Sequence, residues 1–305
     1  MPLDHSGRME SFEQTLVFLH EGGNLWYLLG IVSFYAILEA VLPLTMPSRP
    51  VLRRWFVNFS IHIVNSFVAY LVLFGFFGVS VEASAGNVGI GLFNWLNGVP
   101  LWAQTISFIL VADFLFYWLH RAMHTWRPLW RVHIVHHSDL DVDFSDSFRI
   151  HPFQTLFEMA LRVGLTLVMG VPLIVLIIYD LAYSLFVFYP HSKVNLPRGL
   201  ERILRLVVCT SDLHRTHHAS AREHTNMNYG DIFSFWDRLF GTYEFIEWDE
   251  QRKLTYGLEY FREPKEQSLH RTLLQPFTYN PGKTENAIPA ARRNDGLSGS
   301  VTPTN

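Results

Sequence analysis

The residues best suited to do chemistry in this sequence are histidines that recur at short, regular spacings. They form three clusters: His120-Arg-Ala-Met-His124, His133-Ile-Val-His136-His137 and His214-Arg-Thr-His217-His218. Residues three or four apart lie on one face of a helix, so each cluster directs its imidazoles to one side. Imidazole is the commonest neutral metal ligand near neutral pH. Eight such side chains exceed what one ion can use, so the clusters predict a site for two metal ions.

A carboxylate precedes the first cluster inside an apolar segment, where an ionisable residue is costly and indicates function. Four residues at i, i+4, i+7 and i+11 share one helical stripe: Asp113, Tyr117, His120 and His124. A metal-bound histidine usually donates its second N–H to a carboxylate or a carbonyl. We therefore expect Asp113, with Tyr117 beside it, to support His120 or a neighbouring ligand. The alternative for Asp113 is a polar partner on another helix, such as His62 or Asn65.

Two further histidines lie close to apolar segments. His191 begins the segment His191-Ser-Lys-Val-Asn195, and we expect it to be a ligand with Asn195 one turn further on. His151 precedes Pro152 at the start of an apolar stretch. Three roles remain open for His151: a ligand, a group that supports a ligand, or the first residue of a helix.

Composition indicates a membrane protein. Hydrophobic residues make up 49% of the 305 residues and charged residues 17%, below the roughly 25% of a soluble domain. The single cysteine, Cys209, excludes an internal disulfide framework and a multi-cysteine metal site. The net charge of -3 gives no indication of a nucleic-acid partner.

Four apolar stretches are long enough to approach or cross a bilayer, which needs about 20 residues. They cover residues 25–44, 55–79, 101–119 and 153–189, the last broken at Gly170 and Pro172 into a hairpin. Residues 1–24 are polar and do not resemble a cleaved signal peptide. We therefore predict an all-α, polytopic membrane helical bundle with about four to five apolar segments.

Basic residues predict the orientation of these segments. They are absent from residues 82–98 and concentrated in the other connections: Arg49, Arg53, Arg54, Arg121, Arg127, Arg131, Lys193, Arg198, Arg202 and Arg205. Alternation then places the N-terminus outside and every histidine cluster in a helical cap on the cytoplasmic face. The membrane would be a bacterial inner membrane or the endoplasmic reticulum.

The ordered histidine motifs, with His191 between the second and third clusters, resemble the fatty acid hydroxylase/sterol desaturase superfamily. The segments Asn226-Met-Asn228-Tyr229-Gly230 and Trp236-Asp237-Arg238-Leu-Phe240-Gly241-Thr242-Tyr243 are similar to the end of that family's domain. The likeness is greatest to the branch with alkylglycerol monooxygenase and bacterial sterol desaturase family proteins. Within this stretch, Asp237 and Arg238 would fix ligand orientation, while the aromatic residues would pack the cap.

The resemblance implies two iron ions, O2 as co-substrate and a lipid substrate from the bilayer, such as a sterol, a fatty acyl chain or an ether lipid. It implies nine ligands: His120, His124, His133, His136, His137, His191, His214, His217 and His218. Some relatives carry a further histidine at the position of Asn195, so a tenth ligand would be absent or supplied by His151 or water. The resulting division is a polar segment (1–24), N-terminal transmembrane helices (25–99), a hydroxylase-like di-iron domain (100–248) and a polar extension (249–305), disordered from about 280.

These features predict a membrane-bound hydroxylase or desaturase. The sequence carries no recognisable Rossmann-type phosphate loop or heme-binding domain, so we expect a separate ferredoxin- or cytochrome b5-like protein to supply electrons. A zinc hydrolase is one alternative, although HExxH does not occur and eight histidines exceed one zinc ion's needs. A metal transporter or sensor is another, although its ligands would be expected in mid-bilayer.

Overall fold

The computed structural model describes residues 24–44, 50–76, 91–96 and 98–280. Within these residues the regular structure is helical, apart from three isolated β-bridges. The predicted all-α class is confirmed. The polar segment expected at residues 1–24 lies almost wholly outside the described residues, as does the tail expected to be disordered from about 280.

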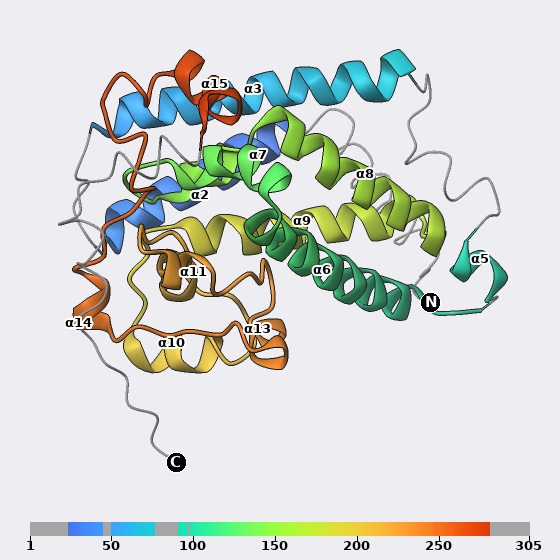
Figure 1. The fold of residues 1–305 in the computed structure, drawn as a ribbon. Helices are drawn as coiled ribbons and strands as arrows, with labels where there is room; N and C mark the ends of the chain where they lie inside the picture. The colour runs from blue at the N-terminus through green and yellow to red at the C-terminus, as the bar shows by residue number, and fades with distance from the viewer. Residues whose placement is uncertain (1–23, 45–49, 77–90, 97, 281–305) are drawn as a thin grey trace.

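Long helices form one half of the molecule (Figure 1). They are α2 (Asn24–Val41), α3 (Val51–Phe76), α6 (Leu101–Thr125), α8 (Pro152–Met169) and α9 (Leu173–His191). Three of them are long and apolar enough to cross a membrane, at Val51–Val72, Leu101–Thr125 and Leu173–His191, and α2 is apolar but shorter. These helices identify an integral membrane protein.

The outer faces of these helices carry large apolar side chains. On α3, Phe56 is 68% exposed, Ile63 68% and Phe67 61%. These residues are spaced by seven and four positions and therefore lie on one helical face. An exposed apolar face of this kind suits contact with lipid rather than water.

The predicted break in the last apolar stretch is a tight turn between α8 and α9. Gly170 ends α8 with a φ of 64°, in the left-handed region that favours glycine, and Pro172 is the N-cap of α9. Helix α6 continues to Thr125, beyond the predicted limit at residue 119. The first histidine pair therefore lies on the same rigid helix as the apolar span.

Short elements gather into a cap at the end of the bundle opposite α5 (Leu92–Trp95) (Figure 1). The cap contains α7 (Arg127–His137), η1 (Phe144–Phe148), α10 (Arg198–Leu204), α11 (Ser211–His217), α12 (Arg222–Thr225), α13 (Phe235–Phe240), α14 (Trp248–Gln251) and α15 (Leu269–Thr278). The C-terminal end of α6 and the whole of α7 lie where the cap meets the bundle. This junction holds the histidines.

A buried ion network fixes the chain that follows α7. Arg54, at the start of α3, contacts Asp139 at 2.9 Å and Asp143 at 2.8 Å. Asp141 pairs with Lys193, just beyond α9, at 2.6 Å. These contacts tie three separate segments together behind the second histidine cluster. Removing one partner of such a buried pair is strongly destabilising.

The chain beyond residue 248 also packs on the cap. Helix α15 contacts α7 and α3. Gln267 accepts a hydrogen bond from buried Arg149 at 3.0 Å and donates to the Ser138 carbonyl at 2.8 Å. Through residue 279, this extension is therefore part of the structure that encloses the histidine helices.

Candidate metal centre

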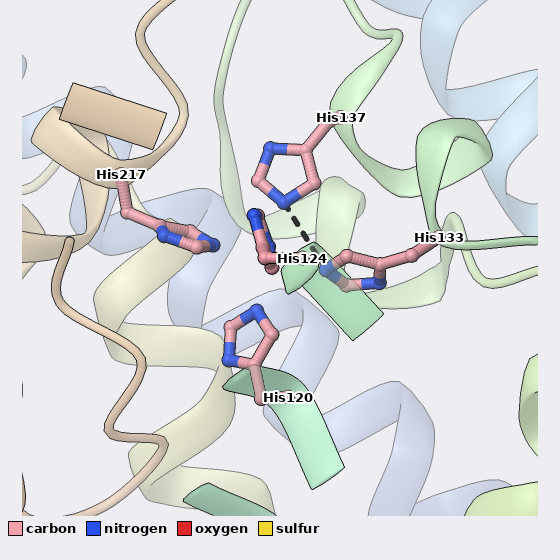
Figure 2. Close-up of side chains that lie close together, drawn as sticks. All are labelled: His120, His124, His133, His137 and His217. Carbon is pink, nitrogen blue, oxygen red and sulfur yellow. Dashed lines mark hydrogen bonds between the residues drawn. The ribbon is translucent and has the colours of Figure 1, made fainter. Parts of the chain in front are cut away.

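All nine histidines named as candidate ligands come together, in two groups. The first holds His120, His124, His133, His137 and His217, and the second holds His136, His191, His214 and His218. Within each group, every residue offers one ring nitrogen within 4.8 Å of the others. Figure 2 shows the imidazoles of the first group converging from separate helices.

Two helices contribute to both groups and hold them side by side. On α7, His133 and His137 join the first group while His136 turns to the second. On α11 and its C-cap, His217 joins the first group while His214 and His218 join the second. The rings of His137 and His218 stack across the two groups with centroids 4.6 Å apart.

Distances between ring nitrogens fit shared coordination of an ion. The Nε2 atoms of His133 and His137 are 3.1 Å apart in the first group. In the second group, His191 Nε2 lies 3.1 Å from His136 Nε2 and 2.9 Å from His214 Nε2. Two nitrogens bound at about 2.1 Å to one ion, at right angles, would be separated by about 3.0 Å. Each group thus matches the donor spacing of one metal site.

The opposite ring nitrogens of four histidines are held by acceptors. His120 Nδ1 lies 2.9 Å from the Tyr229 carbonyl, and His217 Nδ1 lies 2.7 Å from the Met227 carbonyl. His133 Nδ1 faces Gln154 Oε1 at 3.0 Å. His191 Nδ1 faces the carbonyl of residue 187 at 2.8 Å. An acceptor here selects the tautomer with a free Nε2, as is usual for metal-bound histidine.

Several buried nitrogens at the centre lack any partner among the described residues. They include Nε2 of His120 and His217 and both ring nitrogens of His124. A buried polar atom without a partner costs roughly 1–3 kcal/mol. A bound metal ion would satisfy Nε2 of His120 and His217 and one ring nitrogen of His124, so the donor set fits the two ions expected from the sequence.

Protonation at neutral pH does not compete with metal at the cap histidines. Burial, followed by the proximity of other histidines, lowers the pKa of the buried cap histidines well below the usual value: His133, His136, His137, His214, His217 and His218. These imidazoles are therefore neutral near pH 7. Neutral imidazole is the form that binds metal.

The carboxylate of Asp113 does not contact a histidine, contrary to the sequence prediction. It accepts hydrogen bonds from the backbone N–H of Ile232 at 2.9 Å, from that of Phe233 at 3.1 Å and from Trp236 Nε1 at 2.9 Å. The alternative prediction, that Asp113 pairs with His62 or Asn65 on another helix, is also wrong. Asp113 instead anchors the cap segment before α13 to the span.

Tyr117 also contacts the cap rather than a ligand. Its hydroxyl lies 2.8 Å from Thr242 Oγ1 and accepts from Arg121 at 3.3 Å. The shared helical stripe predicted a common environment correctly for His120 and His124. About one turn before His120, at Tyr117, the stripe faces the aromatic packing of the cap, including Phe240.

Asn195 and His151 lie outside both histidine groups. Helix α9 ends at His191, and the exposed Asn195 sits in extended chain whose N–H bonds the Leu42 carbonyl. The expected position one helical turn beyond His191 is therefore wrong. His151 is the N-cap of α8, accepting from the Phe153 N–H at 3.2 Å, while its Nε2 faces the Leu273 carbonyl. Of its three open roles, the start of a helix is the one observed.

The motif near the end of the domain orients one ligand indirectly. Asp237 accepts from the backbone N–H groups of Tyr229 at 2.7 Å and Gly230 at 3.0 Å. This fixes the turn whose Tyr229 carbonyl faces His120. A Cβ on Gly230 would lie 2.3 Å from the Phe233 carbonyl oxygen, so only glycine fits. Arg238 packs on Tyr243 and contacts no histidine of either group in the structure.

Gln154 and Asp231 are site residues that the sequence prediction missed. Gln154 joins His133 to Glu158, whose Oε1 it bonds at 2.8 Å. Asp231 Oδ1 lies 3.7 Å from His120 Nδ1. Gln154 follows His151 by three residues, and Asp231 directly follows the Asn-Tyr-Gly turn. This closeness in sequence to candidate site residues is the signal that could have indicated both.

Two cavities reach the centre from different sides. One, of about 160 Å³, lies between α6, α8 and α9 and includes residues of both groups, such as His120 and His214, in its wall. The other, of about 230 Å³, reaches His124 from the cap and is lined by Arg127, Arg222 and Tyr260 among others. The first cavity adjoins the apolar spans.

Comparison with known proteins shows what the part of the chain that carries this centre is similar to. Residues 105–242 match the fatty acid hydroxylase family. An ornithine lipid hydroxylase of Rhizobium tropici is 32% identical over 149 residues, covering 49% of this chain and 44% of that protein. Human alkylglycerol monooxygenase is 32% identical over 152 residues, covering 50% of this chain and 32% of its own.

A methylsterol monooxygenase of Aspergillus fumigatus is 32% identical over 159 residues, covering 50% of this chain and 51% of that protein. The aligned stretch thus spans about half or less of these relatives. No solved structure matches the chain significantly. All nine clustered histidines lie within the matched residues. Residues 105–242 are therefore similar to the fatty acid hydroxylase family, as the order of the histidine motifs predicted.

Proposed function

We propose that this protein is a membrane-bound di-iron oxidoreductase that uses O2 to hydroxylate or desaturate a lipid. The observation that carries the proposal is the arrangement of nine histidines into two adjoining groups, of five and four, on shared helices. Imidazole suits iron among other transition metals. The family match and the lipid-oxidising names of the relatives favour iron over the other candidates.

The five-histidine group would hold one ion and the four-histidine group the other. Bound iron would supply the redox chemistry that activates O2 and attacks an unreactive C–H bond. The protein holds the ligands in place through Gln154 and through the carbonyls of Tyr229, Met227 and residue 187. Because three of these acceptors are backbone carbonyls and the fourth belongs to the buried Gln154 side chain, the imidazoles are oriented before any ion binds.

The cavity between the spans would admit the lipid. Its wall combines apolar side chains, such as Phe116, Leu119 and Ile150, with histidines of both groups. The apolar part excludes water and suits a hydrocarbon segment close to the ligands. Ornithine lipids, alkylglycerols and methylsterols, named in the relatives, define the range of lipids to be tested first.

The remaining parts of the proposal concern location and electrons. The excess of Arg and Lys in connections at the cap end favours the cytoplasmic face for the metal centre. Electrons would come from a separate ferredoxin- or cytochrome b5-like protein. An attachment site for that partner on the cap would bring it close to the histidines.

Metal analysis combined with activity tests the proposal. Purified, active protein should contain about two irons per chain, and lipid profiles of cells should change only when the intact protein and O2 are both present. The matched control is a His214→Ala variant that inserts in the membrane at the same level. Zinc in a purified, active protein, or an unchanged lipid profile with two irons bound, would contradict the proposal.

A further inference from the structure

The short cap helix α10 presents apolar side chains outward and a charged one inward. Leu200 and Ile203 on the helix, and Leu206 and Val207 in the turn that follows, are all exposed, Ile203 by 66%. The residue of α10 that is buried is Glu201. A helix on a water-facing surface has the opposite arrangement, with its apolar stripe against the core.

The charged side of α10 is held by the rest of the cap. Arg198 and Arg202, four residues apart, each place the guanidinium carbon 5.1 Å from the ring centroid of Trp248. Glu201 accepts a hydrogen bond from the Thr210 hydroxyl at 2.9 Å. These contacts determine which side of α10 packs on protein, and the apolar side therefore faces outward.

Helix α13 extends this apolar surface. Its N-cap, Ser234, donates its backbone N–H to the Val207 carbonyl at 3.0 Å. Arg238 donates to the Arg205 carbonyl at 2.8 Å, so α10 and α13 lie side by side in the cap (Figure 1). Leu239 on α13 is 67% exposed. We call the exposed side chains of these two elements the apolar cap face: Leu200, Ile203, Leu206, Val207 and Leu239.

The apolar cap face adjoins the outer surface of the apolar span α6. Phe240, next to Leu239, packs on Trp118 of α6 with ring centroids 4.9 Å apart. Trp118 is itself exposed, as is Val111, seven residues earlier on the same side of the span. Because these side chains of the span face lipid, the apolar cap face begins where the lipid-facing surface of α6 ends.

We propose that the apolar cap face inserts into the lipid leaflet beside the cap, so that α10 and α13 hold the cap against the bilayer as interfacial helices. An exposed apolar patch marks a site of contact with a partner or a membrane, and the occupant already adjacent to this patch is the lipid around α6. A protein partner would have to displace that lipid to reach the face. This seating of the cap is independent of the reaction at the metal centre.

The seating is connected to the histidine helix α11. Thr210, which donates to Glu201 of α10, is the N-cap of α11. Helix α11 and its C-cap carry His214, His217 and His218. Lipid contact at α10 therefore holds three of the candidate ligands at a fixed depth relative to the bilayer.

Fluorescent labels at four positions of nearly equal exposure test this seating. Ile203→Cys and Leu239→Cys probe the apolar cap face. Ile63→Cys, at a residue of α3 that is 68% exposed, is the lipid reference, and Lys253→Cys, at a side chain that is 68% exposed just after α14, is the water reference. Each full-length variant carries an NBD dye and is reconstituted as one chain per phosphatidylcholine nanodisc. The single cysteine, Cys209, is buried, so the unsubstituted protein should take up little dye and gives the background.

Two quenchers distinguish water from lipid: iodide acts from the aqueous side, and nitroxide-bearing lipids act from the bilayer. Iodide should quench the labels at positions 203 and 239 at least about fivefold less than the label at position 253. An interfacial helix lies about 5–10 Å into the boundary between headgroups and acyl chains, so a nitroxide near the headgroup should quench these two labels more than one deep in the chain. The label at position 63, in the middle of a span, should show the reverse.

Iodide quenching at position 203 or 239 that equals the quenching at position 253 would overturn the proposal. Protection from both quenchers would overturn it as well, because protein rather than lipid would then cover the face. Leu200→Cys and Val207→Cys, at other residues of the apolar cap face, serve if a labelled variant does not fold. Because the measurement requires neither iron nor lipid oxidation, its outcome is separate from that of the proposed function.

Discussion

Replacing His217 by alanine should remove metal from the five-histidine group without preventing the protein from folding. His217 is fully buried, and the centroid of its ring lies 4.7 Å from those of His120, His124 and His137. Its Nδ1 faces the Met227 carbonyl, and its Nε2 has no partner within the described part of the chain. The matched control is His151→Ala, because His151 is also buried but has both ring nitrogens occupied by backbone groups.

In the absence of iron, the two variants should lose similar amounts of stability. His217→Ala leaves a buried carbonyl without a donor, which costs about 1–3 kcal/mol. His151→Ala removes an N-cap, at about 1 kcal/mol, and one contact to the Leu273 carbonyl. Stability alone therefore does not distinguish a ligand from a capping residue.

Iron should separate the two variants. Mutating a group that orients a metal ligand typically lowers metal affinity by 10–100-fold. Loss of a ligand itself should lower the affinity by at least as much. At saturating iron, such a loss removes about 1.4–2.7 kcal/mol or more of the stabilisation that the metal provides. His151→Ala should retain the full iron-dependent stabilisation.

The assay is iron content per chain after equilibration with a graded iron buffer, together with the iron-dependent rise in Tm in detergent. We expect about one iron in His217→Ala where His151→Ala holds about two. Two tightly bound irons in His217→Ala would exclude it as a ligand. Loss of iron from His151→Ala with a normal Tm would refute the assignment of that residue as a cap.

Three further predictions address how the centre is supported. Gln154→Ala, which removes the acceptor facing His133, should weaken iron binding about 10–100-fold, whereas Gln154→Glu should largely restore it in the same iron titration. The iron-free protein should lose stability as pH falls below about 6.5, because the cap histidines have lowered pKa values in the fold and bind protons more readily once unfolded. Each such histidine changes the free energy of unfolding by up to about 1.4 kcal/mol per pH unit. A free energy of unfolding, measured with denaturant, that stays constant from pH 7 to pH 5 would contradict this. Gln267→Ala should cost roughly 2 kcal/mol by leaving the Ser138 carbonyl and Arg149 short of partners, while Lys265→Ala, at an exposed residue, should have little effect on Tm.

The histidine centre could be predicted from the sequence because helical periodicity determines which side chains lie together. Spacings of three and four residues place His133 and His137 on one side of α7, and the same rule applies to His214 and His218 on α11. What the spacing did not determine is that His136 and His137 serve different groups. That division depends on where α9 and α11 dock against α7.

The incorrect expectations arose where local rules were extended past the end of an element. Asn195 would lie one turn after His191 if the helix continued, but the chain becomes extended at residue 192 and pairs with Leu42 and Leu44. Asp113 was correctly identified as an ionisable residue within a span. Its partners are backbone N–H groups 119 and 120 residues away, which no pattern near Asp113 indicates.

The support for the clustered histidines comes largely from groups that a sequence motif cannot describe. Three of the four acceptors facing histidine Nδ1 atoms are backbone carbonyls, and their positions depend on Asp237, Gly230 and the end of α9. Residues beyond the family match at 242 complete this support, since Gln267 and α15 pack behind the chain that links α7 to α8.

Because α7 and α11 each carry histidines of both groups, a shift of either helix would disturb both of the proposed ion sites together. The centre therefore depends on the cap as a single unit. Variants at the back of the cap, such as Gln267→Ala, should lower the occupancy of both ions equally, whereas His217→Ala should affect one ion first.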